Sequence, residues 1–152
     1  MYFLSVLVLM LLAPAGSIAW EHLHGTAPLM LLVGKWFVFW SVGVRLTLAG
    51  LRQQIQPRFT SKEIFGIESD DALPIVRELG VANLATGVVG VLSLIRPGFV
   101  LPVAIAAVIF YGLAGIRHIA SRHRNVNENI ALFSDLFAAA VFAVYVVFAT
   151  VG

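Results

Sequence analysis

The residues of this chain that could do chemistry are a few charged or amide side chains set in otherwise apolar stretches: Arg45, Glu78, Asn83, His118 and Asp135. Inside a bilayer, each charge left alone would cost roughly 2.5 to 3.5 kcal/mol on insertion scales. Such groups therefore pair with one another, and in membrane proteins they often carry protons, ions or ligands. Buried polar groups can equally do no more than specify how helices pair. The sequence leaves both interpretations open for this set.

The depth of each group follows from the helical rise. Counted from the polar residue at the cytoplasmic end of its span (Arg52, Arg77, Arg122 or Asn129), Arg45 lies about 10 Å deep and Asn83 about 9 Å deep. By the same count His118 and Asp135 lie about 6 to 9 Å deep. We therefore expect these side chains, together with Glu78, to form one cluster in the cytoplasmic leaflet.

A tight turn at Arg96-Pro97-Gly98 predicts specific partners within this cluster. If two straight helices leave this turn side by side, Glu78 lies level with Arg117 and His118, so we expect Glu78 to contact one of them. We expect Asp135 to lie opposite Arg45. Tyr111 shares a helical face with His118 and completes the candidate ligand or proton site: Arg45, Glu78, Asn83, Tyr111, Arg117, His118 and Asp135.

The elements that must position these residues are membrane-spanning helices. Of the 152 residues, 60% are hydrophobic and only 12% charged, which is typical of an integral membrane protein. The apolar stretches predict an all-α bundle of five antiparallel, up-down spans in a single domain over residues 1–152: about 2–20, 29–51, 75–95, 99–119 and 130–151. The first stretch could instead be a signal peptide, but no lysine or arginine precedes it, so we expect a retained span.

Residues 52–74 form the longest polar connection. Within it, Thr60-Ser61-Lys62-Glu63 matches a capping box and predicts a short helix that ends at Gly66. Apolar residues among the charges suggest that this amphipathic loop lies on the cytoplasmic membrane surface or docks on a partner.

Glycines recur at helical spacing in two of the predicted spans. Gly80, Gly87 and Gly90 share a face with Asn83, which would let another backbone approach that span closely. Gly112 and Gly115 are the corresponding packing positions in the fourth span.

Basic residues predict the orientation. With five spans, one side of the membrane carries seven of them: Arg52, Arg58, Lys62, Arg77, Arg117, Arg122 and Arg124. The other side carries only Arg96 and Lys35, the latter expected as an interfacial anchor. We therefore expect the inner (cytoplasmic) membrane of a cell, with the amino terminus in the cytoplasm and the carboxyl terminus outside.

Several kinds of chemistry find no support in the sequence. There are no cysteines, and a net charge of +2 is too small to indicate nucleic acid. His22 and His24 are predicted on the side opposite His118 and His123, so the four cannot share a metal or haem. We expect no catalytic residues, no metal and no cofactor, although haem or a quinone is not excluded.

Three segments resemble an uncharacterised prokaryotic family of small membrane proteins: Gly34–Trp40, Arg77–Leu84 and Phe110–His118. The likeness covers roughly residues 30 to 150. The layout is also similar to the broader DoxX-like group of four-helix membrane proteins, but no residue of that group's redox association is carried over. The resemblance implies a helical membrane fold and no particular activity.

The sequence favours a non-enzymatic function. The leading hypothesis is an accessory, assembly or scaffold subunit that binds membrane lipids and other membrane chains or copies of itself. One alternative is an oligomeric transporter or channel that uses the polar cluster for protons or ions. Another is an enzyme subunit with a lipid or quinone site.

Overall fold

The computed structural model describes residues 2–121 and 124–151, and these residues form helices and connections without any strand. Arg122 and His123, which entered the predictions above, lie outside the described residues. Five helices are long and apolar enough to cross a membrane: Tyr2–His24, Leu29–Ile55, Asp70–Leu92, Pro97–Ala120 and Val126–Val151. The predicted all-helical class and number of candidate spans are thus confirmed.

The long helices are built from shorter segments. The first comprises α1 (Tyr2–Leu7), a π-helical segment η1 (Val8–Leu12) and α2 (Ala13–His24). The second comprises α3 (Leu29–Phe37), the π-helical segment η2 (Val38–Val44) and α4 (Arg45–Ile55). The rest of the chain supplies α5 (Pro57–Phe59), π-helical η3 (Thr60–Ile64), 3-10 η4 (Asp70–Ala72), α6 (Leu73–Leu92), 3-10 η5 (Pro97–Phe99), α7 (Val100–Ala120) and α8 (Val126–Val151).

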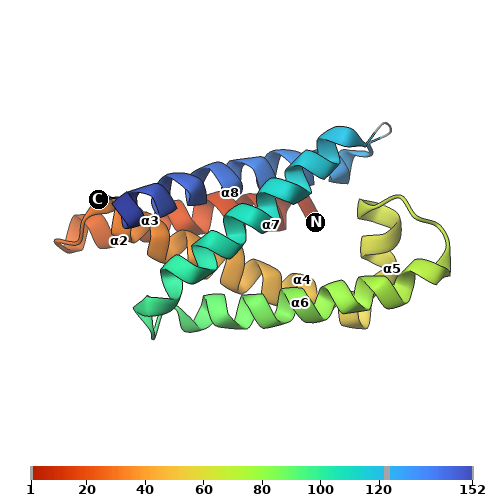
Figure 1. The fold of residues 1–152 in the computed structure, drawn as a ribbon, viewed down its shortest axis with the longest axis horizontal. Coiled ribbons are helices and arrows are strands. Elements are labelled where there is room, and N and C mark those ends of the chain that lie inside the picture. The colour runs from red at the N-terminus through yellow and green to blue at the C-terminus, as the bar shows by residue number, and fades with distance from the viewer. Residues whose placement is uncertain (1, 122–123, 152) are drawn as a thin grey trace.

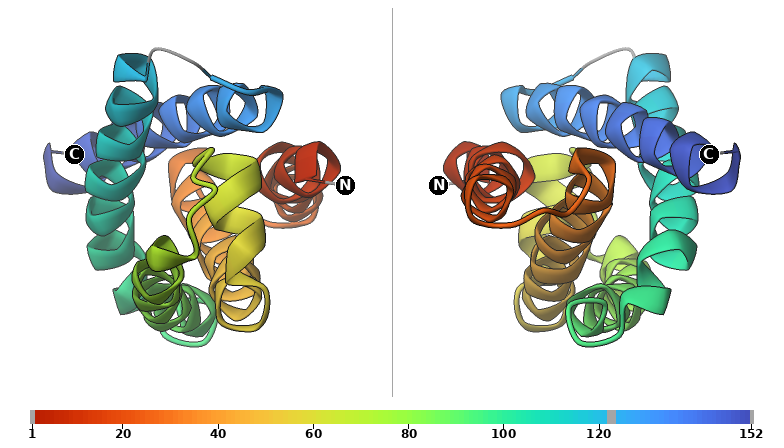
Figure 2. Two further views of the ribbon diagram at one scale, coloured as in Figure 1. Left: turned by 90° about the vertical axis from the view of Figure 1, so that its right-hand side faces the viewer. Right: turned by 90° about the vertical axis from the view of Figure 1, so that its left-hand side faces the viewer.

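The second long helix lies in the middle of the molecule, and it is the most buried of the five (Figure 2). α4 packs along α6, and α7 packs along α8. The connection over residues 56–69, the last turn of α7 and the first turn of α8 lie at one end of the molecule, here called the loop end (Figure 1). The connections at residues 25–28 and 93–96 lie at the opposite end, here called the turn end. From the turn end, α6 and α7 diverge.

Glycines make the close contact between the central helix and α6 possible. A methyl group added at Gly43 would lie 2.7 Å from the Val91 nitrogen, and one added at Gly50 would lie 2.7 Å from the Gly80 carbonyl oxygen. A methyl group added at Gly87 would likewise overlap with the backbone of Thr47. The glycine face of α6 is therefore filled by the chain itself. In α7, Gly115 packs closely on Leu136, whereas a methyl group at Gly112 would make only an ordinary contact.

The polar connection at the loop end folds back onto the bundle. Ser61 and Ile64 are buried, and the Ser61 hydroxyl donates to the Ile67 carbonyl at 2.8 Å. The Asn125 side chain, just before α8, donates to the Glu63 carbonyl at 3.1 Å. The predicted capping box is wrong, because the helical turn already begins at Pro57 and Thr60 lies within it. Gly66 ends the segment as predicted, in the left-handed conformation with φ of 66°.

Candidate functional site

Arg45 is the charged residue at the centre of the bundle. It begins α4, and its side chain is 16% exposed. Its Nη2 lies 3.4 Å from Asp135 Oδ1 on α8, and its guanidinium carbon lies 5.3 Å from the centroid of the Tyr111 ring. The structure therefore brings Arg45 and Asp135 together, as expected from their similar depth. Arg45 links the central helix to α7 and α8.

His118 lies between two carboxylates. Its Nδ1 is 3.3 Å from Glu128 Oε1, and its Nε2 is 4.0 Å from Asp135 Oδ2. Glu128 and Asp135 are seven residues apart on α8 and so face the same side of that helix. We call this group, which joins three helices, the ionic cluster: Arg45, Tyr111, His118, Glu128 and Asp135.

The π-helical segment η2 explains how Tyr111 is held. In an α-helix the Arg45 N–H would bond to the Ser41 carbonyl, but here it bonds to the carbonyls of Trp40 and Val42. The Ser41 carbonyl oxygen instead accepts the Tyr111 hydroxyl at 2.5 Å. Both residues are fully buried. The wider turn thus supplies an acceptor inside an apolar core, where an unbonded hydroxyl would be costly.

The ionic cluster contains groups of both signs. Arg45 supplies one positive charge, and Glu128 and Asp135 supply one negative charge each when ionised. Because an uncompensated charge is expensive at low exposure, Arg45 and the carboxylates stabilise one another in this position.

Three predicted members of the site lie elsewhere. Glu78 and Arg117 are exposed, and in the part of the chain described neither forms an ion pair. The predicted contact of Glu78 with Arg117 or His118 does not form, because α6 and α7 diverge from the turn that joins them (Figure 1). Asn83 is buried but bonds to the central helix, where its Nδ2 donates to Gln53 Oε1 at 2.9 Å.

Glu128 was missed because the fifth span was expected to begin at residue 130. The helix begins at Val126, and Asn125 Oδ1 accepts the Glu128 backbone N–H at 2.8 Å. Asn125 followed three residues later by Glu128 is a helix-start pattern that was present in the sequence. The seven-residue spacing between Glu128 and Asp135 would then have placed both carboxylates on one face.

A second polar group lies at the turn end. Lys35 Nζ donates to both carboxylate oxygens of Glu21 at 2.7 Å, and Trp36 Nε1 donates to Glu21 Oε2 at 2.7 Å. Trp40 Nε1 donates to the Ser17 hydroxyl at 3.0 Å. Lys35, expected from the sequence as an interfacial anchor, is therefore also an ion-pair partner that joins the first long helix to the second.

None of these groups has the arrangement of a metal site: over residues 2–121 and 124–151, no three His, Cys, Asp or Glu side chains are placed to hold a metal ion. The ionic cluster can fix three helices against one another.

One family model matches residues 1–151 of the chain, and its description is a family of unknown function (DUF6790). The match covers nearly the whole sequence, so the chain belongs to this family. It also includes the first long helix, which the resemblance over residues 30 to 150 had left out. No curated protein and no solved structure matches the chain.

Proposed function

We propose that this member of the DUF6790 family spans the inner membrane of a cell as five antiparallel helices and serves there as a non-catalytic accessory, assembly or scaffold subunit. The observation that carries the proposal is that the buried charges pair with one another. Arg45, Asp135, His118 and Glu128 form a single network. Little ionic chemistry is left for a substrate.

The outer surface of the helices supports the same proposal. Many large apolar side chains are exposed along all five long helices, including Phe3, Val81, Leu113 and Phe133. In a bilayer such a surface contacts acyl chains or the helices of other proteins. In this proposal the ionic cluster is structural: it fixes α4 against α7 and α8, so that the outer surface keeps one shape.

A proton or ion carrier is the second candidate, favoured by the position of His118 between two carboxylates. The core toward the turn end is apolar, with Val38, Ala104 and Phe142 fully buried. A path across the membrane would therefore have to run between copies of the chain. Proton flux into liposomes that is lost in Asp135→Asn would favour the carrier over the accessory role.

The accessory role is tested by native mass spectrometry of the tagged full chain after extraction in mild detergent. We expect the chain in a complex of defined stoichiometry with other membrane chains, together with bound lipid. A tagged membrane protein of similar size, extracted in the same way, controls for chance association. Recovery of the chain only as a monomer, or with the same proteins as the control, would contradict the proposal.

A further inference from the structure

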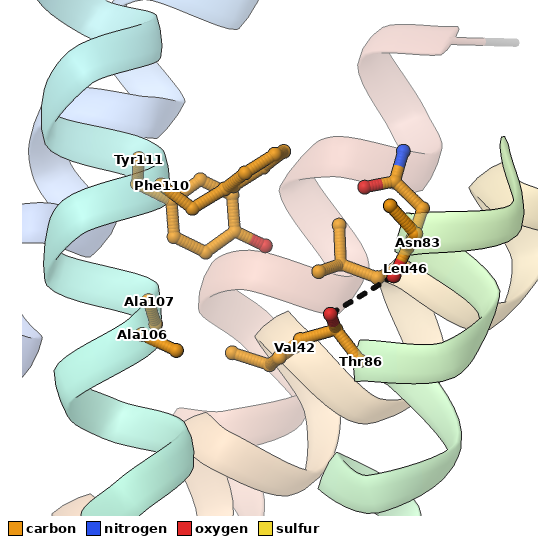
Figure 3. A pocket seen from close by; sticks show the side chains of 9 residues that line it. Val42, Leu46, Asn83, Thr86, Ala106, Ala107, Phe110 and Tyr111 are labelled. Atoms are coloured by element: carbon orange, nitrogen blue, oxygen red, sulfur yellow. Dashed lines mark hydrogen bonds between the residues drawn. The ribbon is translucent and has the colours of Figure 1, made fainter. Parts of the chain in front are cut away.

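A small cavity lies next to the ionic cluster, where α6 and α7 diverge (Figure 3). Its volume is about 90 Å³. It is lined by residues of the central helix, α6 and α7: Val42, Leu46, Ala82, Asn83, Thr86, Ala106, Ala107, Phe110 and Tyr111. Most of this lining is apolar, so the three polar side chains determine what the cavity can recognise.

Each of these three side chains already donates one hydrogen bond to a protein oxygen, and the Asn83 amide keeps a second N–H. The Thr86 hydroxyl donates to the Ala82 carbonyl at 2.9 Å, and the Tyr111 hydroxyl donates to the Ser41 carbonyl at 2.5 Å. Asn83 Nδ2 donates to Gln53 Oε1 at 2.9 Å. A hydroxyl has one proton to donate and two lone pairs to accept with, so both hydroxyls keep acceptor capacity only.

The Asn83 amide oxygen is the best placed of the remaining acceptors. Asn83 is only 5% exposed, and no residue that the structure describes donates to its Oδ1. Figure 3 shows this oxygen and the Tyr111 hydroxyl turned toward the space between α6 and α7. Asn83 lines the cavity, and the hydrocarbon region of a membrane supplies no water to pair with its oxygen, so a ligand that brings a donor has a specific advantage there.

We propose that this cavity binds the hydroxyl group of a long-chain alcohol dissolved in the membrane. The ligand O–H donates to Asn83 Oδ1, and its alkyl chain leaves between α6 and α7. This inference rests on membrane insertion, as does the proposed function, but it does not depend on the accessory role.

The charges around the cavity select against other donors. An ammonium group would find no carboxylate in the lining, and it would be repelled by Arg45, which lies 5.3 Å from the Tyr111 ring. A quinone or an ester brings acceptors only, which could pair with the second Asn83 N–H but would leave Asn83 Oδ1 and both hydroxyl oxygens without a donor. A neutral hydroxyl satisfies Asn83 at no electrostatic cost.

Size and depth select a linear alcohol. An engineered cavity of about 150 Å³ holds benzene, so this smaller cavity admits a hydroxymethyl group and a few further carbons rather than a ring. Asn83 lies about 9 Å along the helix from Arg77, below the level that lipid phosphates reach. The hydroxyl must therefore belong to a molecule that can enter the hydrocarbon region.

The test uses the full chain in phosphatidylcholine nanodiscs, because this lipid has no hydroxyl of its own. The probes are 10-fluorodecan-1-ol and its methyl ether, which keeps the oxygen but lacks the donor. Their binding is followed by ¹⁹F NMR. We expect saturable binding of the alcohol and about three- to tenfold weaker binding of the ether.

Two variants locate the site. Ala106→Leu should abolish binding of both probes, because the added side chain fills the cavity from a position exposed to lipid. Ala85→Leu makes the same change on α6 at an exposed position that does not line the cavity, and it should leave binding unchanged. Melting temperatures of both variants show whether the fold is retained.

Three outcomes would overturn the inference: equal saturable binding of alcohol and ether, partition without saturation, or binding that survives in a folded Ala106→Leu variant. The second outcome would mean that the cavity holds water only. Recovery of the chain as a monomer would contradict the accessory role and leave this inference intact, so the two proposals can fail separately.

Discussion

At the scale of single residues, the Arg45–Asp135 pair has two possible energetic roles. Pairing inside a low-dielectric core can do little more than offset the cost of removing both charges from water. Removing one partner is different, because it leaves the other charge buried without compensation. The two roles are separated by comparing single and double substitutions.

We expect Asp135→Leu to lower the free energy of unfolding by about 3 kcal/mol, because it leaves Arg45 unpaired beside the apolar core. The double variant Arg45→Met/Asp135→Leu should recover most of this loss. Asp70→Asn, which removes a surface partner of Arg58, should cost at most about 1 kcal/mol. SDS-induced unfolding of the detergent-solubilised protein measures all three. A double variant no more stable than Asp135→Leu would contradict the structural role of the pair.

Some contacts of these residues could be predicted from the sequence, and others could not. Arg45 and Asp135 could be paired from the sequence because both were counted to a similar depth in the same leaflet, and depth follows from the helical rise alone. Tyr111 could be placed on the same face as His118, but its bond to Ser41 could not be foreseen. That bond depends on the π-helical segment Val38–Val44, which contains no proline to indicate an irregular turn.

At the scale of elements, prediction failed where it required the angle between two helices. Glu78 was assigned a partner on α7 by assuming that the two helices of the turn stay side by side. They diverge, because α6 packs on the central helix through Gly80, Gly87 and Gly90, and α7 packs on α8. The glycine spacing did indicate that α6 has a closely packed face, but it did not say which helix would fill it.

The glycine contact gives a prediction at this scale. Gly87→Ala should lower the free energy of unfolding by about 1 to 3 kcal/mol, because the added methyl group meets the backbone of Thr47 and the helices must separate. Gly16→Ala is the matched control, since a methyl group there meets nothing within 4 Å. Because alanine has a higher helix propensity than glycine, Gly16→Ala should leave the free energy of unfolding unchanged or raise it by up to about 1 kcal/mol. Equal effects of the two substitutions would show that α4 and α6 are not in close contact.

At the scale of the whole molecule, the distribution of charge is asymmetric between the two ends. Arg52, Arg58 and Lys62 belong to the loop end, together with the paired Asp70 and Glu68. The turn end has Lys35, which is neutralised by Glu21, and Arg96. Because orientation depends on lysine and arginine rather than on net charge, the acidic partners at the loop end do not weaken the expectation that this end faces the cytoplasm.

The sequence contains no cysteine, so single cysteines can report this orientation directly. Glu68 and Thr26 are exposed positions at the loop end and the turn end, respectively. In bacterial spheroplasts, whose inner membrane is intact, we expect Thr26→Cys to react with a membrane-impermeant maleimide. We expect Glu68→Cys to react only after the inner membrane has been permeabilised. Labelling of Glu68→Cys alone in intact cells would reverse the orientation. Labelling of both variants in intact cells would show that the loop end and the turn end are not on opposite sides of a membrane. The depths inferred for the ionic cluster and for the alcohol cavity would then be wrong.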